Sequence, residues 1–171
     1  MSRIALTSRD MAMKSARRRY VPILSVLASS AVVLLPIIML NPIIPDVSFM
    51  VLIAWRLLRP EMWTPSSALP LGLFNDLMAG HPLGQSMALW TMTFLLLDFV
   101  DSRAVFRDYW MDWLLAAVLI LFHSFGEWLV GKAMGSHISF GVLWPQIGIS
   151  VLAYPFIARL AVTLDRWRLS R

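Results

Sequence analysis

Six apolar segments divide the chain, and this pattern constrains its fold more than any other feature of the sequence. The segments are residues 22–40, 46–58, 65–79, 85–100, 110–130 and 142–164. A helix needs about 20 residues to cross roughly 30 Å of hydrocarbon, so the first, fifth and sixth segments are long enough. The second and third are too short unless protein surrounds them at membrane depth, and Pro70 predicts a kink in the third.

The composition favours a membrane protein over a soluble domain. Of the 171 residues, 58% are hydrophobic and 15% are charged, whereas soluble domains have roughly 45–50% apolar and about 25% charged residues. A basic N-terminus precedes an apolar run longer than the roughly 7–15 residues of a signal-peptide core, so we expect an uncleaved first span. The chain has no cysteine, which excludes disulfides, thiolate nucleophiles and thiolate metal sites.

Basic residues fall into every second gap between the apolar segments. Six Lys and Arg residues precede the first segment, two lie at the end of the second, two follow the fourth and four lie near the C-terminus. If all six segments cross, these 14 of the 15 basic residues lie on one side of the membrane. Lys132 alone lies on the opposite side. Short cytoplasmic loops are enriched in Lys and Arg, so we predict that both termini are cytoplasmic. A basic collar facing anionic lipid headgroups accounts for the net charge of +5 without a nucleic-acid partner.

Together these features predict an all-α integral membrane protein, a compact bundle of six, or alternatively five, transmembrane helices. We expect a basic N-terminal segment over residues 1–20, one transmembrane domain over residues 21–165 and a basic tail over residues 166–171. The tryptophans near predicted span ends are expected to form an interfacial belt; they are Trp55, Trp63, Trp110, Trp113, Trp144 and Trp167. Trp90 and Trp128 are predicted to pack inside the bundle.

The stretch "GLFNDLMAGHPLGQSMAL" places a carboxylate, Asp76, just before a turn between the third and fourth segments. Gly80 is expected to end the third helix in the left-handed conformation, and Pro82 and Gly84 to shape the turn. We expect the Asp76 carboxylate to accept hydrogen bonds from the free N–H groups of residues 85–87 at the start of the next helix. A contact with a partner protein or ligand is the alternative. Catalysis is disfavoured because no second carboxylate is near in sequence.

Two further groups of ionisable residues lie within or beside the predicted spans, where each needs a partner or a role. Asp98 and Asp101 are expected to form an interfacial ion-pair cluster with Arg103 and Arg107, and a proton or ion path is the alternative.

His123 and Glu127 share one face of the fifth segment at i, i+4 spacing. We interpret them as a satisfied polar pair, with a substrate-binding or proton-coupled site as the alternative. The order H-S-F-G-E is not a metalloprotease motif, and two ligands alone make a poor zinc site. We therefore expect no catalytic residue, no metal and no cofactor.

The stretch from Leu71 to Trp90 resembles the signature region of MreD, a family of bacterial rod shape-determining membrane proteins. The family pattern is G-L-x-x-D-L-hydrophobic-x-G-x-P-L-G-x-x-A-L. The matching residues are Gly72, Leu73, Asp76, Leu77, Gly80, Pro82, Leu83, Gly84, Ala88 and Leu89. His81 stands where serine or threonine is common. The motif covers about 20 residues, and the remainder of the chain agrees in length, basic N-terminus and hydropathy.

The resemblance implies a non-enzymatic scaffold of the cell-elongation (rod) complex in the bacterial inner membrane, supporting cell shape and lateral peptidoglycan synthesis. Its partners would be MreC, a single-span periplasmic protein, and MreB, a cytoplasmic actin-like protein. RodA and a penicillin-binding transpeptidase would be contacted directly or through MreC. The fold would be similar to the substrate-capture subunits of vitamin transporters.

The resemblance also implies a structural or interface role for Asp76, Gly80, Pro82 and Gly84. The alternative function is a substrate-capture or transport subunit, which predicts a polar intramembrane pocket lined by His123, Glu127 and Asp76.

Overall fold

The computed structural model describes residues 8–34, 45–103 and 108–170, and within these ranges it contains helices and no strand. The helices are α1 (Ser8–Ala31), α2 (Val47–Leu58), α3 (Pro65–Ala79), α4 (Gln85–Asp101), α5 (Tyr109–Ala133) and α6 (Trp144–Leu169), with the short 3₁₀ turns η1 (Val32–Leu34), η2 (Pro60–Met62) and η3 (Phe140–Leu143). The predicted all-α class is confirmed, and five of the six helices begin within two residues of the predicted segments.

The two ends of the chain differ from the predicted segments. Helix α1 begins at Ser8, inside the region predicted to be a separate basic segment, and α6 continues to Leu169 through most of the predicted tail. The basic ends of the chain therefore prolong the first and last helices. Residues 35–40 of the predicted first segment lie outside the described residues.

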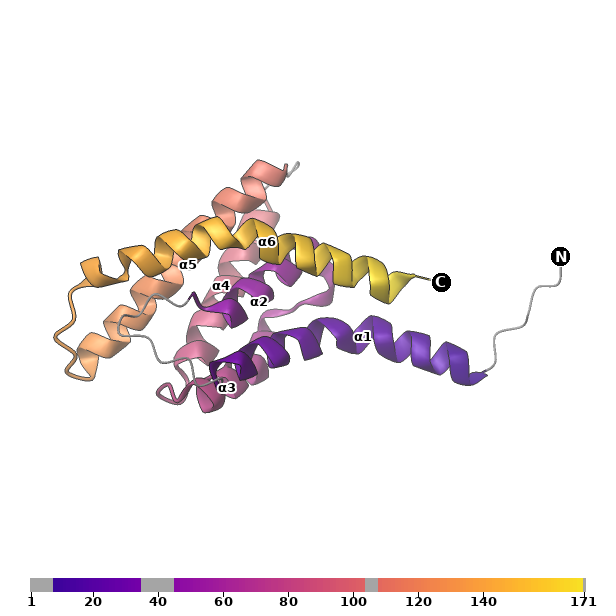
Figure 1. The fold of residues 1–171 in the computed structure, drawn as a ribbon, viewed down its shortest axis with the longest axis horizontal. Coiled ribbons are helices and arrows are strands. Elements are labelled where there is room, and N and C mark those ends of the chain that lie inside the picture. Colours follow the sequence, from indigo (N-terminus) through magenta and orange to yellow (C-terminus); the bar gives the residue numbers. More distant parts are fainter. Residues whose placement is uncertain (1–7, 35–44, 104–107, 171) are drawn as a thin grey trace.

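Helix α2 lies inside the bundle, between α1, α5 and α6 (Figure 1). Ten of its twelve residues are buried, over residues 48–57. Its sequence, VSFMVLIAWRLL, has no continuous polar face, and a helix that is apolar all round is stable only when surrounded by apolar material. This burial explains how so short a segment can form a regular helix.

Helices α3 and α4 form an antiparallel hairpin with a very close backbone contact. A Cβ atom added at Gly72 would lie 2.5 Å from the Cα of Met87, so only glycine allows this approach. Beside it the Asn75 side-chain amide donates to the Ser86 hydroxyl oxygen over 3.0 Å. Small residues at a helix crossing allow this kind of packing in membrane bundles.

The bundle is apolar outside and partly polar inside. Large apolar side chains are exposed along α4, α5 and α6; they include Leu95, Phe99, Leu114, Val118, Leu129, Leu152 and Phe156. Buried polar side chains include Asn75, Asp76, Thr93, His123 and Ser150. Within the described ranges, two helical stretches, Tyr109–Ala133 and Phe140–Leu169, are long and apolar enough to cross a membrane, judged by length and composition alone.

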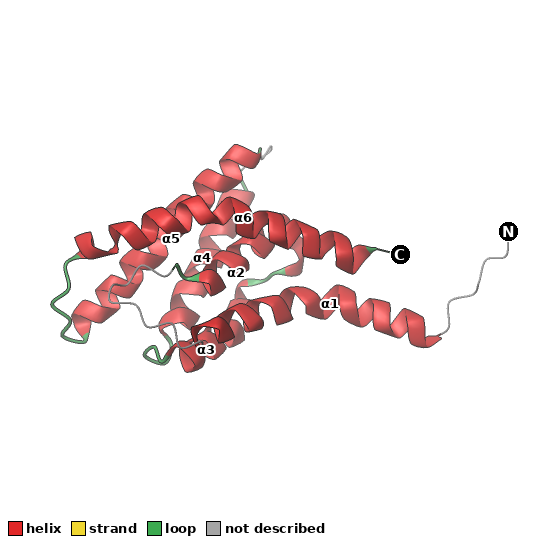
Figure 2. Cartoon of the chain, viewed as in Figure 1, coloured by secondary structure: helices red, strands yellow, loops and turns green. Residues whose placement is uncertain are grey.

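The two chain ends lie opposite two of the loops in the view of Figure 1. In Figure 1 the N-terminal end of α1 and the C-terminal end of α6 project toward the same side, at the right of the view. The α3–α4 turn and the α5–α6 loop lie toward the left, as Figure 2 shows.

Two of the tryptophans predicted to lie in the interfacial belt are buried in the bundle. Trp110, Trp144 and Trp167 are exposed near helix ends, where a belt would place them. Trp55 and Trp63 are buried, and the Trp55 indole N–H donates to the Ser25 hydroxyl over 2.7 Å. Their assignment to the belt was wrong because α2, which contains Trp55 and precedes Trp63, lies within the bundle.

The α3–α4 contact predicts opposite effects of alanine at two helical glycines. Gly72→Ala should lower the free energy of unfolding by about 1–3 kcal/mol, because the new methyl group forces the two backbones apart. Gly148→Ala in α6 meets nothing within 4 Å and should raise it by up to about 1 kcal/mol, since alanine is the better helix former. Melting temperatures in detergent measure both, and equal melting temperatures would contradict the close contact.

Candidate functional site

The Asp76 carboxylate links the end of α3 to the start of α4. One of its oxygens accepts from the Ser86 N–H at 2.8 Å, and the other accepts from the Gly84 N–H at 2.9 Å. The expected bond to the start of α4 is present at Ser86, while the second donor is Gly84, which precedes the predicted residues 85–87. A buried carboxylate at a helix N-terminus is stabilised by these donors and by the helix dipole.

The turn itself has the predicted geometry. Gly80 ends α3 in the left-handed conformation, with φ of 69°, and its N–H donates to the Asp76 carbonyl. Gly84 also has a positive φ, of 96°. The Gln85 N–H donates to the Pro82 carbonyl at 3.0 Å. Asp76 therefore binds the turn through both its backbone and its side chain.

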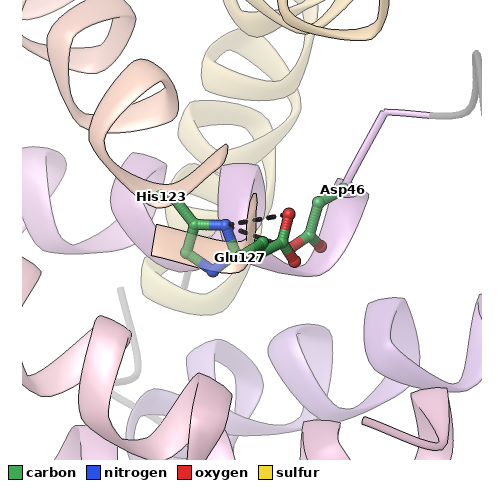
Figure 3. Close-up of side chains that lie close together, drawn as sticks. All are labelled: Asp46, His123 and Glu127. Atoms are coloured by element: carbon green, nitrogen blue, oxygen red, sulfur yellow. Dashed lines mark ion pairs between the residues drawn. The ribbon is translucent and has the colours of Figure 1, made fainter. Parts of the chain in front are cut away.

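A second polar cluster joins α5 to the start of α2. Nδ1 of His123 lies 3.8 Å from a carboxylate oxygen of Glu127, one helical turn away, and 3.9 Å from a carboxylate oxygen of Asp46 (Figure 3). The His123 side chain is 2% exposed, and its ring stacks on Phe49 with centroids 4.0 Å apart. The predicted pair is thus a group of three residues.

Sequence reasoning gave Asp46 no role beyond the first residue of the second segment. It is the N-cap of α2, where its Oδ1 accepts from the Phe49 N–H at 3.0 Å and from the Ser48 hydroxyl at 2.5 Å. An aspartate directly before an apolar run is a known helix-start signal. That signal predicts the N-cap of α2, but it does not predict that Asp46 lies next to His123 of α5.

The cavity at this cluster is small. It has a volume of about 10 Å³ and is lined by Asp46, Phe49, Met50, Ile120, His123, Ser124, Gln146 and Ser150. That volume holds about one water molecule or one ion, whereas pockets for small organic ligands measure roughly 300–1,000 Å³. Asp76 belongs to the neighbouring α3–α4 turn and does not line this cavity.

A third cluster gives Asp98 and Asp101 a partner that the sequence did not indicate. Both carboxylates pair with Arg56 of α2, whose side chain is 2% exposed; the guanidinium NH1 lies 3.0 Å from Asp101. Arg103 instead lies over the Phe99 ring, 4.6 Å from its centroid, and Arg107 lies outside the described residues. The expected ion-pair cluster is present, and its partner on α2 is Arg56, whose buried charge requires these carboxylates. The pairing with Arg107 stays a prediction.

Arg59, just after α2, forms a related pair. Its guanidinium donates to Asp165 of α6 at 2.7 Å, and Arg168 binds the same carboxylate. The hydrogen bond to Asp165 raises the pKa of Arg59 above its ordinary value. The C-terminal end of α2 is therefore joined by ion pairs to both α4 and α6.

One cleft among the described residues is large enough for an organic ligand. It measures about 570 Å³ and lies between the start of α5 and the C-terminal half of α6, lined by Leu58, Tyr109, Asp112, Trp113, Tyr154, Ala158, Arg159, Val162, Thr163 and Arg166. None of the residues predicted to form a site lines it.

Comparison with known proteins gives no relative: no protein-family model, curated protein or solved structure matches the chain. The resemblance to MreD therefore stays a prediction that depends on residues 71–90.

The Asp76 geometry predicts a graded response to substitution. Asp76→Leu leaves two backbone N–H groups without their acceptor, which costs about 1–3 kcal/mol for each buried group. Asp76→Asn keeps one acceptor oxygen and should lose about half as much. Thermal unfolding in detergent measures both changes.

Asp108→Asn is the matched control, because Asp108 precedes α5 without capping it through its side chain. Its melting temperature should equal that of the wild type. If Asp76→Leu were as stable as this control, the carboxylate would not hold the turn.

Proposed function

We propose that the chain is a non-enzymatic, multi-pass scaffold of the MreD type in the bacterial inner membrane. The observation that carries the proposal is that, within residues 71–90, some residues hold the turn and others are exposed on its surface. Asp76, Gly80, Pro82 and Gly84 of the signature build the α3–α4 turn, whereas three of its four leucines are exposed: Leu83 is 72%, Leu77 60% and Leu73 41% exposed, and Leu89 is buried. A structural turn that presents exposed leucines supports a role in contacting another protein.

An exposed apolar face of α3 could bind the helix of a partner protein. Leu69, Leu73 and Leu77 are exposed and recur every four residues, so they share one face of the helix. An apolar stripe of this kind packs against lipid or against another apolar helix. The single transmembrane helix of MreC is the partner that the MreD resemblance implies for it. MreB, RodA and the penicillin-binding transpeptidase would then be reached through the basic cytoplasmic side or through MreC.

The membrane assignment has two further supports. The apolar exterior combined with buried polar groups suits lipid as the surrounding solvent. The sorting of basic residues into alternate gaps suits six crossings with both termini in the cytoplasm.

A substrate-capture function receives less support. The cavity next to His123 is too small for a vitamin-sized molecule, and the larger cleft involves neither Glu127 nor Asp76. Retention of a small organic molecule through purification would favour this alternative.

The six-crossing topology predicts a labelling pattern for single-cysteine variants, which have no background because the chain has no cysteine. Leu83→Cys and Ser139→Cys should react with a membrane-impermeant maleimide in intact spheroplasts. Glu61→Cys and Ser102→Cys should react only after the membrane is opened. Reaction of either inner-side variant in intact spheroplasts would exclude six crossings.

The scaffold proposal predicts crosslinks from one face of α3. A photocrosslinking amino acid at Leu77 should capture MreC in rod-shaped cells that depend on this chain, whereas the same amino acid at Leu152, equally apolar and exposed on α6, serves as the control. Depletion of the chain should turn rods into spheres. Normal rods after depletion, with no MreC crosslink from either position, would contradict the proposal.

A further inference from the structure

We propose that Asp46, His123 and Glu127 form a binding site for one divalent transition-metal cation, with Zn²⁺ as the best-suited ion. The site would connect the start of α2 to the outer half of α5. It goes beyond the scaffold function, which requires no metal.

The spacing of the three donor atoms fits a single ion. Nδ1 of His123 lies 3.9 Å from Oδ2 of Asp46 and 3.8 Å from Oε2 of Glu127, and the three atoms all lie within 4.8 Å of one another. These separations are too long for hydrogen bonds. Zinc binds nitrogen and oxygen ligands at about 2.0–2.2 Å, so the ligands of a tetrahedral ion are about 3.4 Å apart. Side-chain shifts of about 0.5–1 Å would bring all three donors onto one ion.

The hydrogen bonding around Asp46 leaves one carboxylate oxygen for a ligand. Oδ1 caps α2, whereas Oδ2 is buried and has no hydrogen-bond partner among the described residues. Neither Asp46 nor Glu127 contacts an arginine or lysine in the described part of the chain. Two carboxylates that converge on a buried imidazole without a neighbouring cation are unfavourable. A divalent cation would neutralise both.

The donors are held by rigid elements. Asp46 is fixed by its cap bonds, and the His123 ring is fixed against Phe49 in the first turn of α2. Glu127 follows His123 by one turn of α5, so both side chains point to the same side (Figure 3). Preorganised donors of this kind lose little conformational freedom when an ion binds.

The type of donor selects the ion. One imidazole nitrogen and two carboxylates suit zinc and neighbouring transition metals, whereas Mg²⁺ prefers oxygen ligands in octahedral geometry. The absence of cysteine excludes thiolate coordination. The adjoining cavity of about 10 Å³, which Gln146 and Ser150 also line, has room for a water molecule as a fourth ligand.

Three variants of the full-length chain separate metal binding from folding. Asp46→Asn removes a charged ligand but keeps the cap, because asparagine caps helices as well as aspartate. Glu127→Gln is isosteric. His137→Gln is the control, since His137 is an exposed histidine in the α5–α6 loop. Each protein is purified in detergent without a polyhistidine tag, stripped with EDTA and titrated with Zn²⁺ against a fluorescent chelator.

We expect the wild type and His137→Gln to bind one zinc ion per chain and to melt at a higher temperature with Zn²⁺, but not with Mg²⁺. Asp46→Asn and Glu127→Gln should bind at least about 100-fold more weakly, beyond the roughly 10- to 100-fold loss typical of outer-shell changes. X-ray absorption of the wild-type zinc complex should show one nitrogen and otherwise oxygen ligands, a result that does not depend on the variants folding.

Absence of stoichiometric zinc binding by the wild type would overturn the proposal. So would unchanged affinity in both ligand variants, or loss of binding in His137→Gln. None of these results affects the crosslink from α3 to MreC, so failure of the metal site and failure of the scaffold are distinguishable.

Discussion

The burial of α2 on every side is the constraint on which the other features of the bundle depend. At about 1.5 Å per residue its twelve residues span roughly 18 Å, less than the hydrocarbon of a bilayer. Both of its polar ends must therefore be satisfied by protein. Asp46 caps the N-terminal end, and Arg56 at the C-terminal end pairs with Asp98 and Asp101 of α4. Negative charge at the start and positive charge at the end also match the helix dipole.

The same constraint separates what the sequence could predict from what it could not. Five helices start within two residues of the positions predicted from the apolar runs and the breaks between them. These starts were predictable because apolar periodicity and turn residues are properties of the local sequence. The bond from Asp76 to the start of α4 was also predictable, since only a short turn separates the two. Interactions between distant segments were not predictable: 76 residues separate Asp46 from His123, and the whole of α3 lies between Arg56 and Asp98 in the sequence.

The errors share one physical cause. Trp55 was assigned to the belt, and Asp98 to the nearby arginines, from their positions near a predicted span end. Position along a span says nothing about which neighbours surround a helix. The short length of the second segment already indicated surrounding protein, and its lack of a polar face together with an arginine near its end is a second signal of an interior position.

The hydrogen bonds from the Gly84 and Ser86 N–H groups to the Asp76 carboxylate, here called the lock, have an evolutionary consequence. Its donors are the N–H groups of Gly84 and Ser86, and a backbone N–H is present at every residue except proline. The exposed side chain at Leu83 takes no part in the lock. Substitutions there can change the exposed surface of the turn without changing the hydrogen bonds that hold it, so this surface is free to diverge while the stability of the turn is inherited.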